Sequence, residues 1–238
     1  MAIRVHRYAD ATRLNEGVAA ELGRFIASVQ ADGLPVSLCL SDGLSNVCAA
    51  LGLSEDCAAI DPEKISLWWS DDFFVDVTDP LRGSTKTLAA LGTALRFVPE
   101  RVHPMPTPSG NPDVDAAALV YADELGDIPF DLAVLMMGSD GSVAGLRPGT
   151  KVFTKPSPHT VAGVADEFGT RLTLTLRALA RSSAIWLVAS GEQAAKALAR
   201  TVEDDAELPS GLLRGCQFTH VFADEAAASL LPYFQCEL

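Results

Sequence analysis

Short apolar runs recur along the whole chain, and each has the length of one buried strand. A run of about five apolar residues bounded by small and polar ones is typical of a strand covered on both faces of a parallel sheet. The runs cover residues 36–40, 65–69, 132–136, 184–189 and 218–222. We predict that they all lie in one sheet.

Segments with helical periodicity separate these runs. In residues 10–31, apolar residues that include Leu14, Val18 and Leu22 recur at steps of three and four, and Asp10 stands where an N-cap is needed. Further helices are predicted after residue 45, at 84–95, at 112–125, after Gly191 and at the C-terminal end, with the caps Ser45 or Asn46, Asn111 and Asp224.

The alternation of strands and helices predicts the fold class. It favours an α/β fold with a doubly wound, mostly parallel sheet and helices on both faces, Rossmann-like and three-layered. The alternating Leu and Thr of 171–176 fit a strand or an extended entry to a helix. Because periodicity resumes directly after the proline-rich segment 97–112, we expect a single domain over residues 1–238.

The stretch 131–149 carries the first candidate ligand site. Its apolar part ends in a loop dense in glycine, which contains Gly138, Asp140 and Gly141. Glycine lets the main chain adopt positive φ and approach a ligand, and successive N–H groups form a concavity suited to anions such as phosphate. In an open α/β sheet, ligands bind at the carboxyl ends of the strands. An ordinary βα turn with surplus glycine would give the same pattern.

The ends of two other apolar runs carry candidate chemistry as well. Residues 41–45 are mostly small and polar and lead into a helix N-terminus, which is a second candidate anion site. Asp71 and Asp72 follow the next run, and crowded carboxylates can serve as acid and base because one pKa is raised. An exposed turn is the plainer alternative for this pair. A shared site requires that the loops 41–45, 70–73 and 138–149 meet at one edge of the sheet.

Composition excludes some classes of partner. The 238 residues carry a formal net charge of −13, whereas nucleic acids and polybasic membrane contacts need clustered cations. The N-terminal residues lack the pattern of a signal peptide, and no apolar run reaches the ~20 residues of a membrane span, so we expect a cytoplasmic protein. Without a CxxC pair, the cysteines predict small buried hydrophobes, not a zinc site or a disulfide framework. They are Cys39, Cys48, Cys57, Cys216 and Cys236.

Five segments carry motifs in a fixed order. They are LSDGLSN at 40–46, WSDDF at 69–73, MGSDGSVAGLRPG at 137–149, RLTLT at 171–175 and SGEQAAK at 190–196. Together they resemble the 6-phosphogluconolactonases, which share a fold with the glucosamine-6-phosphate deaminases and isomerases. The resemblance covers nearly the whole chain.

The resemblance implies hydrolysis of a small phosphorylated sugar lactone, 6-phosphogluconolactone, to 6-phosphogluconate in the oxidative pentose phosphate pathway, without a metal or organic cofactor. Such a reaction needs a base for water, donors for the oxyanion and cations for the phosphate. By resemblance the catalytic candidates are Asp71, Asp72, Asp140 and Ser142. The substrate- and phosphate-binding candidates are Ser41, Gly43, Ser45, Gly138, Gly141, Arg147, Arg171 and Lys196. We expect a monomer or a weak homodimer.

The chain departs from the family pattern at five positions. Ser142 stands where the family has the histidine taken to be the general base, and a serine hydroxyl with no neighbouring base cannot accept a proton near neutral pH. Phe73 replaces an arginine and Asp72 shortens a glutamate. Asp42 replaces a glycine of the phosphate loop and repels a phosphate, whereas Arg147 replaces a phenylalanine and restores one cation.

Two hypotheses of different classes follow. The first is a 6-phosphogluconolactonase-type hydrolase in which another residue, with His159 and Asp71 as candidates, takes the proton. The second is a catalytically impaired homologue that binds a sugar phosphate or a protein partner. Sugar-phosphate isomerisation or deamination is disfavoured, because those relatives also use the histidine that Ser142 replaces.

Overall fold

Seven parallel strands form the central sheet. The computed structural model describes residues 3–92, 94–155 and 159–232. In spatial order the strands are β1 (Ile3–Tyr8), β10 (Phe218–Asp224), β9 (Ala184–Ala189), β6 (Leu132–Met136), β2 (Val36–Leu40), β3 (Ile65–Trp69) and β5 (Val102–His103). All five predicted strands lie in this sheet, so that prediction is confirmed. Every residue of β9 is buried, as expected for a strand covered on both faces.

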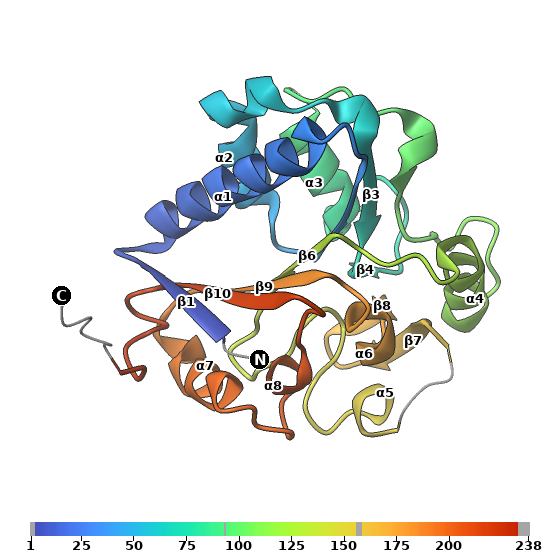
Figure 1. Ribbon diagram of the computed structural model, residues 1–238. Coiled ribbons are helices and arrows are strands. Elements are labelled where there is room, and N and C mark those ends of the chain that lie inside the picture. Colours follow the sequence, from blue (N-terminus) through green and yellow to red (C-terminus); the bar gives the residue numbers. More distant parts are fainter. Residues whose placement is uncertain (1–2, 93, 156–158, 233–238) are drawn as a thin grey trace.

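Helices cover both faces of the sheet. The helices α1 (Ala11–Ala31), α2 (Ser45–Leu53) and α3 (Gly83–Leu91) lie above it in Figure 1, and α7 (Ala195–Val202) and α8 (Pro209–Leu212) lie below. The remaining helices are α4 (Val114–Leu125), α5 (Lys151–Thr154) and α6 (Leu176–Leu179), with short 3-10 turns at Glu55–Ala59, Pro62–Lys64, Pro99–Arg101 and Glu192–Ala194. The predicted three-layer α/β architecture is confirmed.

The helix ends match the sequence only in part. Asp10 caps α1 by accepting a hydrogen bond from the Arg13 N–H at 2.8 Å, as predicted. Helix α2 starts at Ser45 without a side-chain cap. The cap of α4 is Asp113 and not Asn111, because the Asp113 carboxylate reaches the Ala116 N–H at 2.8 Å while the Asn111 amide bonds to the Thr107 carbonyl. Turns, not the predicted terminal helix, follow Asp224.

A second, antiparallel sheet is the main feature that the apolar runs do not predict. Its strands are β4 (Asp71–Phe73), β8 (Gly169–Leu174) and β7 (Val161–Asp166), in that order. Only Ser70 separates β3 from β4, and the Leu174 N–H donates to the Ser70 carbonyl at 2.7 Å. The register places Phe73 opposite Arg171. This pairing brings the predicted cation to the end of β3.

Most of the cysteines are buried, as predicted. Cys39, Cys48 and Cys57 lie in the core, whereas Cys216 is exposed against expectation, and Cys236 lies outside the described residues. Within the described ranges, no cluster of His, Cys, Asp and Glu could hold a metal ion.

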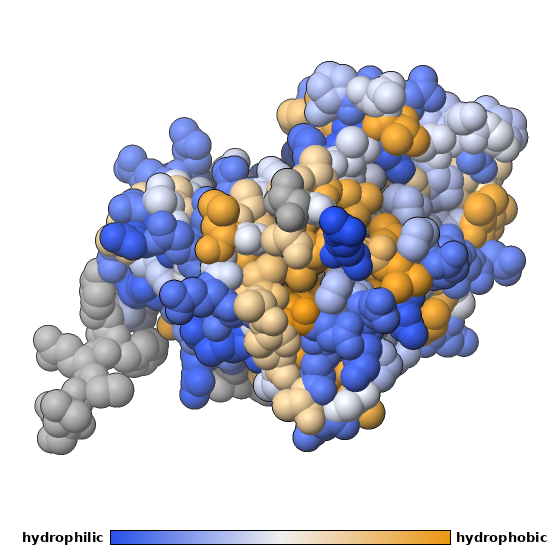
Figure 2. Space-filling view, turned by 90° about the horizontal axis from the view of Figure 1, so that it is seen from above, coloured by the Kyte–Doolittle hydropathy of each residue, from blue (hydrophilic) through white to orange (hydrophobic). Residues whose placement is uncertain are grey.

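The outer surface over α1, α2 and α3 mixes apolar and hydrophilic residues. Figure 2, which looks down on this side, shows a band of apolar side chains between hydrophilic ones. Leu53, the last residue of α2, is 90% exposed. None of the described helices is both long enough and apolar enough to cross a lipid bilayer. The cytoplasmic location stays a prediction.

Candidate active site

A hollow of about 190 Å³ lies at the carboxyl ends of the strands, where the predicted loops begin. It is lined by Ser41, Asp42, Gly43, Asp71, Met136, Gly138, Ser142, Ala144 and Arg171. The loops 41–45, 70–73 and 138–149 therefore meet at one edge of the sheet, as the sequence predicts. Of the predicted site residues, the hollow brings together Ser41, Gly43, Asp71, Gly138, Ser142 and Arg171.

The loop after β2 is fixed against β6. The Ser41 hydroxyl accepts a hydrogen bond from the Met136 N–H at 2.7 Å, and the Ser41 N–H donates to the Val134 carbonyl at 3.0 Å. Gly43 has φ +92°, and a Cβ there would lie 3.3 Å from the Met136 side chain. Glycine is thus the residue that suits both the backbone and the space. Ser45, the first residue of α2, does not line the hollow.

Arg171 enters the hollow already paired with carboxylates. Its Nη1 lies 3.0 Å from Asp71 Oδ2 and 3.7 Å from Asp42 Oδ2. The guanidinium stacks on the Phe73 ring at 3.6 Å from the ring centre. Asp42 also lies 3.8 Å from the Nζ of Lys86 on α3, a cation that the sequence analysis missed. An incoming anion would therefore compete with Asp42 for both cations.

Asp71 is a buried carboxylate that faces this hollow. Its Oδ1 accepts hydrogen bonds from the Ser70 hydroxyl at 2.9 Å and from the Asp42 N–H at 3.3 Å. Burial raises the pKa of Asp71 to about 6; the positive charge of Arg171 opposes this rise, and the charge of Asp42 adds to it. The carboxylate can thus exchange a proton near neutral pH.

Asp72 points away from the hollow, because successive residues of a strand face opposite sides. Its Oδ1 accepts hydrogen bonds from the N–H groups of Phe73 at 2.9 Å and Gly83 at 2.8 Å, and its Oδ2 accepts one from Ser84 at 3.0 Å. The guanidinium of Arg82, also buried, lies 3.8 Å away. Asp72 therefore anchors the N-terminus of α3. Its position outside the hollow does not support the predicted catalytic role.

We expect Asp72→Ala to destabilise the fold. Removal of one partner of a buried ion pair costs about 3–5 kcal/mol, which corresponds to a fall in Tm of about 6 °C or more for a chain of this size. Thermal unfolding measures it. Asp113→Ala, which removes the exposed cap of α4, is the matched control and should cost only about 1 kcal/mol. Equal losses in the two variants would contradict the buried anchor.

The loop after β6 closes tightly on itself. The Gly138 N–H donates to the Ser142 carbonyl at 2.9 Å, and the Asp140 carboxylate accepts from the Ser142 N–H at 3.0 Å and from its side chain. A Cβ at Gly138 would lie 2.2 Å from Ser142 Oγ. Gly141, at φ +81°, packs on Leu208 and not in the hollow. The loop thus places the Ser142 side chain directly against the backbone of Gly138, which has no side chain.

Asp140 stays charged, although it is partly buried. Burial by itself would raise its pKa, but the hydrogen bonds from Ser142 and the charge of Arg147 outweigh burial and lower the pKa of Asp140. The Nη1 of Arg147 lies 3.3 Å from Asp140 Oδ2, its Nε lies 3.6 Å from Asp166 Oδ2, and its guanidinium stacks on Phe168. Arg147 is consequently held beside the loop and does not line the hollow.

Two further candidates lie elsewhere. Lys196 is exposed on α7 and is not among the residues that line the hollow. His159, considered as a replacement base, is exposed and lines a separate depression with residues of α4. Neither side chain is placed to act at Asp71 or Ser142.

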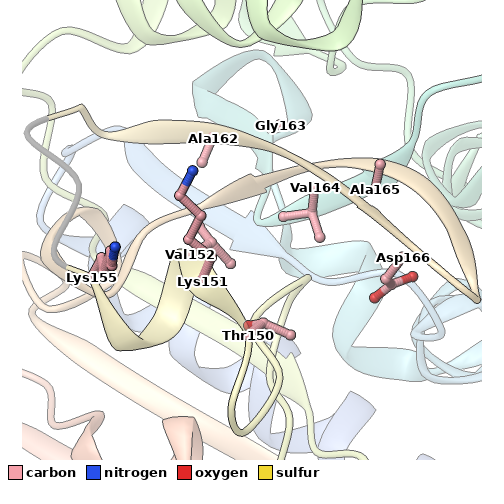
Figure 3. Close-up of a pocket in the computed structure, with 9 residues that line it drawn as sticks. All are labelled: Thr150, Lys151, Val152, Lys155, Ala162, Gly163, Val164, Ala165 and Asp166. Carbon is pink, nitrogen blue, oxygen red and sulfur yellow. The ribbon is translucent and has the colours of Figure 1, made fainter.

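A larger hollow of about 460 Å³ lies between α5 and β7 (Figure 3). Figure 3 shows Lys151 reaching toward β7 at Ala162, and Asp166 at the other end of the pocket. None of the predicted site residues lines it. The smaller hollow is therefore the candidate active site.

Nearly the whole chain is similar to known proteins of one family. The model of the glucosamine-6-phosphate isomerases/6-phosphogluconolactonase matches residues 9–222. A 6-phosphogluconolactonase of Streptomyces coelicolor is 35% identical over 247 aligned residues, which span 96% of this chain and 94% of that protein. The chain belongs to this family. A 6-phosphogluconolactonase of Mycobacterium leprae is 29% identical, over 98% of this chain and all of that protein.

Solved structures agree on the fold of the glucosamine-6-phosphate isomerase/6-phosphogluconolactonase family. The crystal structure of 6-phosphogluconolactonase from Thermotoga maritima has a TM-score of 0.81 at 21% identity, over 93% of this chain and 99% of that one. A monomeric glucosamine-6-phosphate deaminase has a TM-score of 0.78 at 17% identity, over 96% of this chain and all of that one. At these identities the likeness shows the fold alone.

Three of the five positions at which the sequence is expected to depart from the family pattern lie at the hollow. Asp42 and Ser142 line it, and Phe73 stacks on Arg171. The sequence analysis did not identify Met136, Ala144 or Lys86 as site residues. Ala144 has a φ of +53°, a backbone conformation that an alanine in the sequence does not indicate.

Proposed function

We propose that this chain hydrolyses 6-phosphogluconolactone to 6-phosphogluconate, the reaction implied for the oxidative pentose phosphate pathway. The observation that carries the proposal is the hollow itself, in which the loop after β2, Asp71, the Gly138–Ser142 loop and Arg171 converge. Such a site combines a carboxylate for proton transfer with a cation for the phosphate. The names of the relatives at 35% and 29% identity support the same substrate.

The geometry divides the hollow into two functional ends. Arg171 lies beside the Ser41–Gly43 loop at the start of α2, where a phosphate suits both the guanidinium and the helix N-terminus. Gly138 and Ser142 line the other wall and, in our proposal, flank the lactone carbonyl. In the proposed reaction, the groups that act on the lactone and water are side chains and main-chain groups of this chain.

The second candidate function is a catalytically impaired homologue that binds a sugar phosphate or a protein partner. Two observations favour it. Ser142 bonds to Asp140 and offers no base, and the Asp42 carboxylate already neutralises Arg171. The two candidates differ in one measurable quantity, the rate of lactone opening.

A spectrophotometric lactonase assay on freshly generated 6-phosphogluconolactone, corrected for spontaneous hydrolysis, tests the proposed function. We expect turnover above the uncatalysed rate. A rate equal to the background would remove the hydrolase proposal and leave the binding protein.

Ligand binding is tested separately from turnover. We expect 6-phosphogluconate at millimolar concentration to raise the Tm of the wild type by mass action, and Arg171→Ala to abolish the shift. Arg13→Ala, which breaks only an exposed pair with Glu16, is the charge-matched control and should keep it. The same shift in all three proteins would contradict a phosphate contact at Arg171.

A further inference from the structure

A hydrolase with Ser142 at the family's histidine position needs another proton acceptor within the hollow. The titratable side chains that line it are Asp42, Asp71 and Arg171. Arg171 does not release its proton near neutral pH. Asp42 pairs with two cations, Arg171 and Lys86, whereas Asp71 pairs with Arg171 alone. Asp71 is the remaining carboxylate.

We propose that Asp71 is the general base of this enzyme and takes the proton from the attacking water. This inference rests on the proposed lactone hydrolysis. It assigns to a carboxylate on β4 the role that the histidine at position 142 has in the family pattern, and it makes the Ser142 hydroxyl dispensable for proton transfer.

The hydrogen bonds of Asp71 leave room for a water molecule. A carboxylate offers about four lone-pair positions, two on each oxygen. Oδ1 uses both of its positions, since it accepts from Ser70 Oγ and from the Asp42 N–H. Oδ2 accepts from Arg171 Nη1, and no second donor to it occurs among the described residues. The free position on Oδ2 belongs to a residue that lines the hollow, so a water there can give up its proton.

The groups around Asp71 suit it to this role. Arg171 on β8 holds Oδ2 in place, and Asp42 on the β2 loop opposes the charged form. Lys86 on α3 partly balances Asp42, the neutral thiol of Cys39 lies buried nearby on β2, and Asp72 with Arg82 occupies the opposite face of β4. The resulting pKa of about 6 lies near neutral pH, and a general base is most effective when its pKa is close to the working pH.

The step balances without another reactant. Water oxygen bonds to the lactone carbonyl carbon as Asp71 accepts a water proton, and the carbonyl π electrons move to the oxygen. The tetrahedral intermediate then collapses: the bond from carbon to the ring oxygen breaks, and the ring oxygen takes the proton from Asp71. The products are the hydroxy acid and an unprotonated Asp71, ready for the next cycle.

The first test compares Asp71→Asn with Asp113→Asn, a matched change at an exposed helix cap outside the hollow. We expect Asp71→Asn to lower kcat by about 10²–10⁴-fold, the usual effect of losing a general base, and Asp113→Asn to stay within about threefold of the wild type, since asparagine also caps helices. Because Asn resembles the protonated carboxyl that burial favours, the Tm of Asp71→Asn should be no lower than that of the wild type. A folded Asp71→Asn variant that retains full activity would overturn the proposal.

The second test uses the pH profile and does not depend on removing Asp71. In the wild type, kcat/KM should fall as the pH drops through about 6, because the protonated carboxyl cannot accept a proton. Asp42 raises the pKa of Asp71, so Asp42→Asn should move this acid limb to lower pH. A merely structural role for Asp71 would not couple the limb to Asp42, and an unmoved limb would refute the assignment. A wild type without lactonase activity would instead remove the proposed function and this inference together.

Discussion

Asp42→Gly is expected to lower the KM for 6-phosphogluconolactone by about tenfold or more, since a unit charge a few ångströms from the ligand phosphate is worth one or more kcal/mol at a half-buried site. The Asp42 carboxylate lies 3.7 Å from Arg171 and 3.8 Å from Lys86. The substrate phosphate must replace it at Arg171. Steady-state kinetics at low ionic strength give the largest effect, because salt screens the repulsion.

Asp42→Asn separates the charge of Asp42 from its shape. If the charge sets the affinity, the asparagine and glycine variants should show the same fall in KM. A fall in the glycine variant alone would mean that backbone freedom or space, not charge, limits binding. An unchanged KM in both variants would contradict the competition between Asp42 and phosphate.

Ser142→His, made in the Asp71→Asn background, is expected to raise kcat by about 10²-fold over Asp71→Asn alone, because it returns a base to the site. Both positions line the same hollow. Gly138 has no side chain, which leaves space beside residue 142. A Cβ on residue 138 would lie only 2.2 Å from the Ser142 Oγ. The measurement is kcat for the double variant against each single variant.

Ser142→His in the wild-type background is the control. Its gain in kcat should stay below about tenfold, because Asp71 already supplies the base. A gain of the full size in the wild type, without any loss in Asp71→Asn, would show that Asp71 does not carry the proton. No rescue in the double variant would show that the loop cannot present an imidazole to the substrate.

The central sheet could be read from the apolar runs because parallel strands are buried on both faces and therefore leave a strong signal. The small sheet could not. Strand β4 has three residues, and the ion pair that joins it to β8 connects Asp71 with a partner 100 positions away. Local periodicity carries no information about such a pairing.

The same limit explains which site residues were misjudged. Asp71 and Asp72 are neighbours in the sequence, which suggests a crowded pair, but the pleat of β4 sends them to opposite faces. Phe73 could be read only as the loss of an arginine, whereas the β4–β8 register makes it the ring on which Arg171 stacks. The pairing of β4 with β8 in three dimensions determines the positions of these side chains, and the sequence motifs do not show it.

The pleat of β4 ties thermal stability to turnover. One residue of this strand, Asp72, anchors α3 through two backbone N–H groups, and the residue before it faces the hollow. Any mutation that frees the start of α3 also releases the strand that aims the carboxylate. Gly83 and Ser84 do not line the hollow, but substitutions there should still lower the rate of the reaction. Such variants should lose activity at temperatures at which the rest of the sheet is still folded.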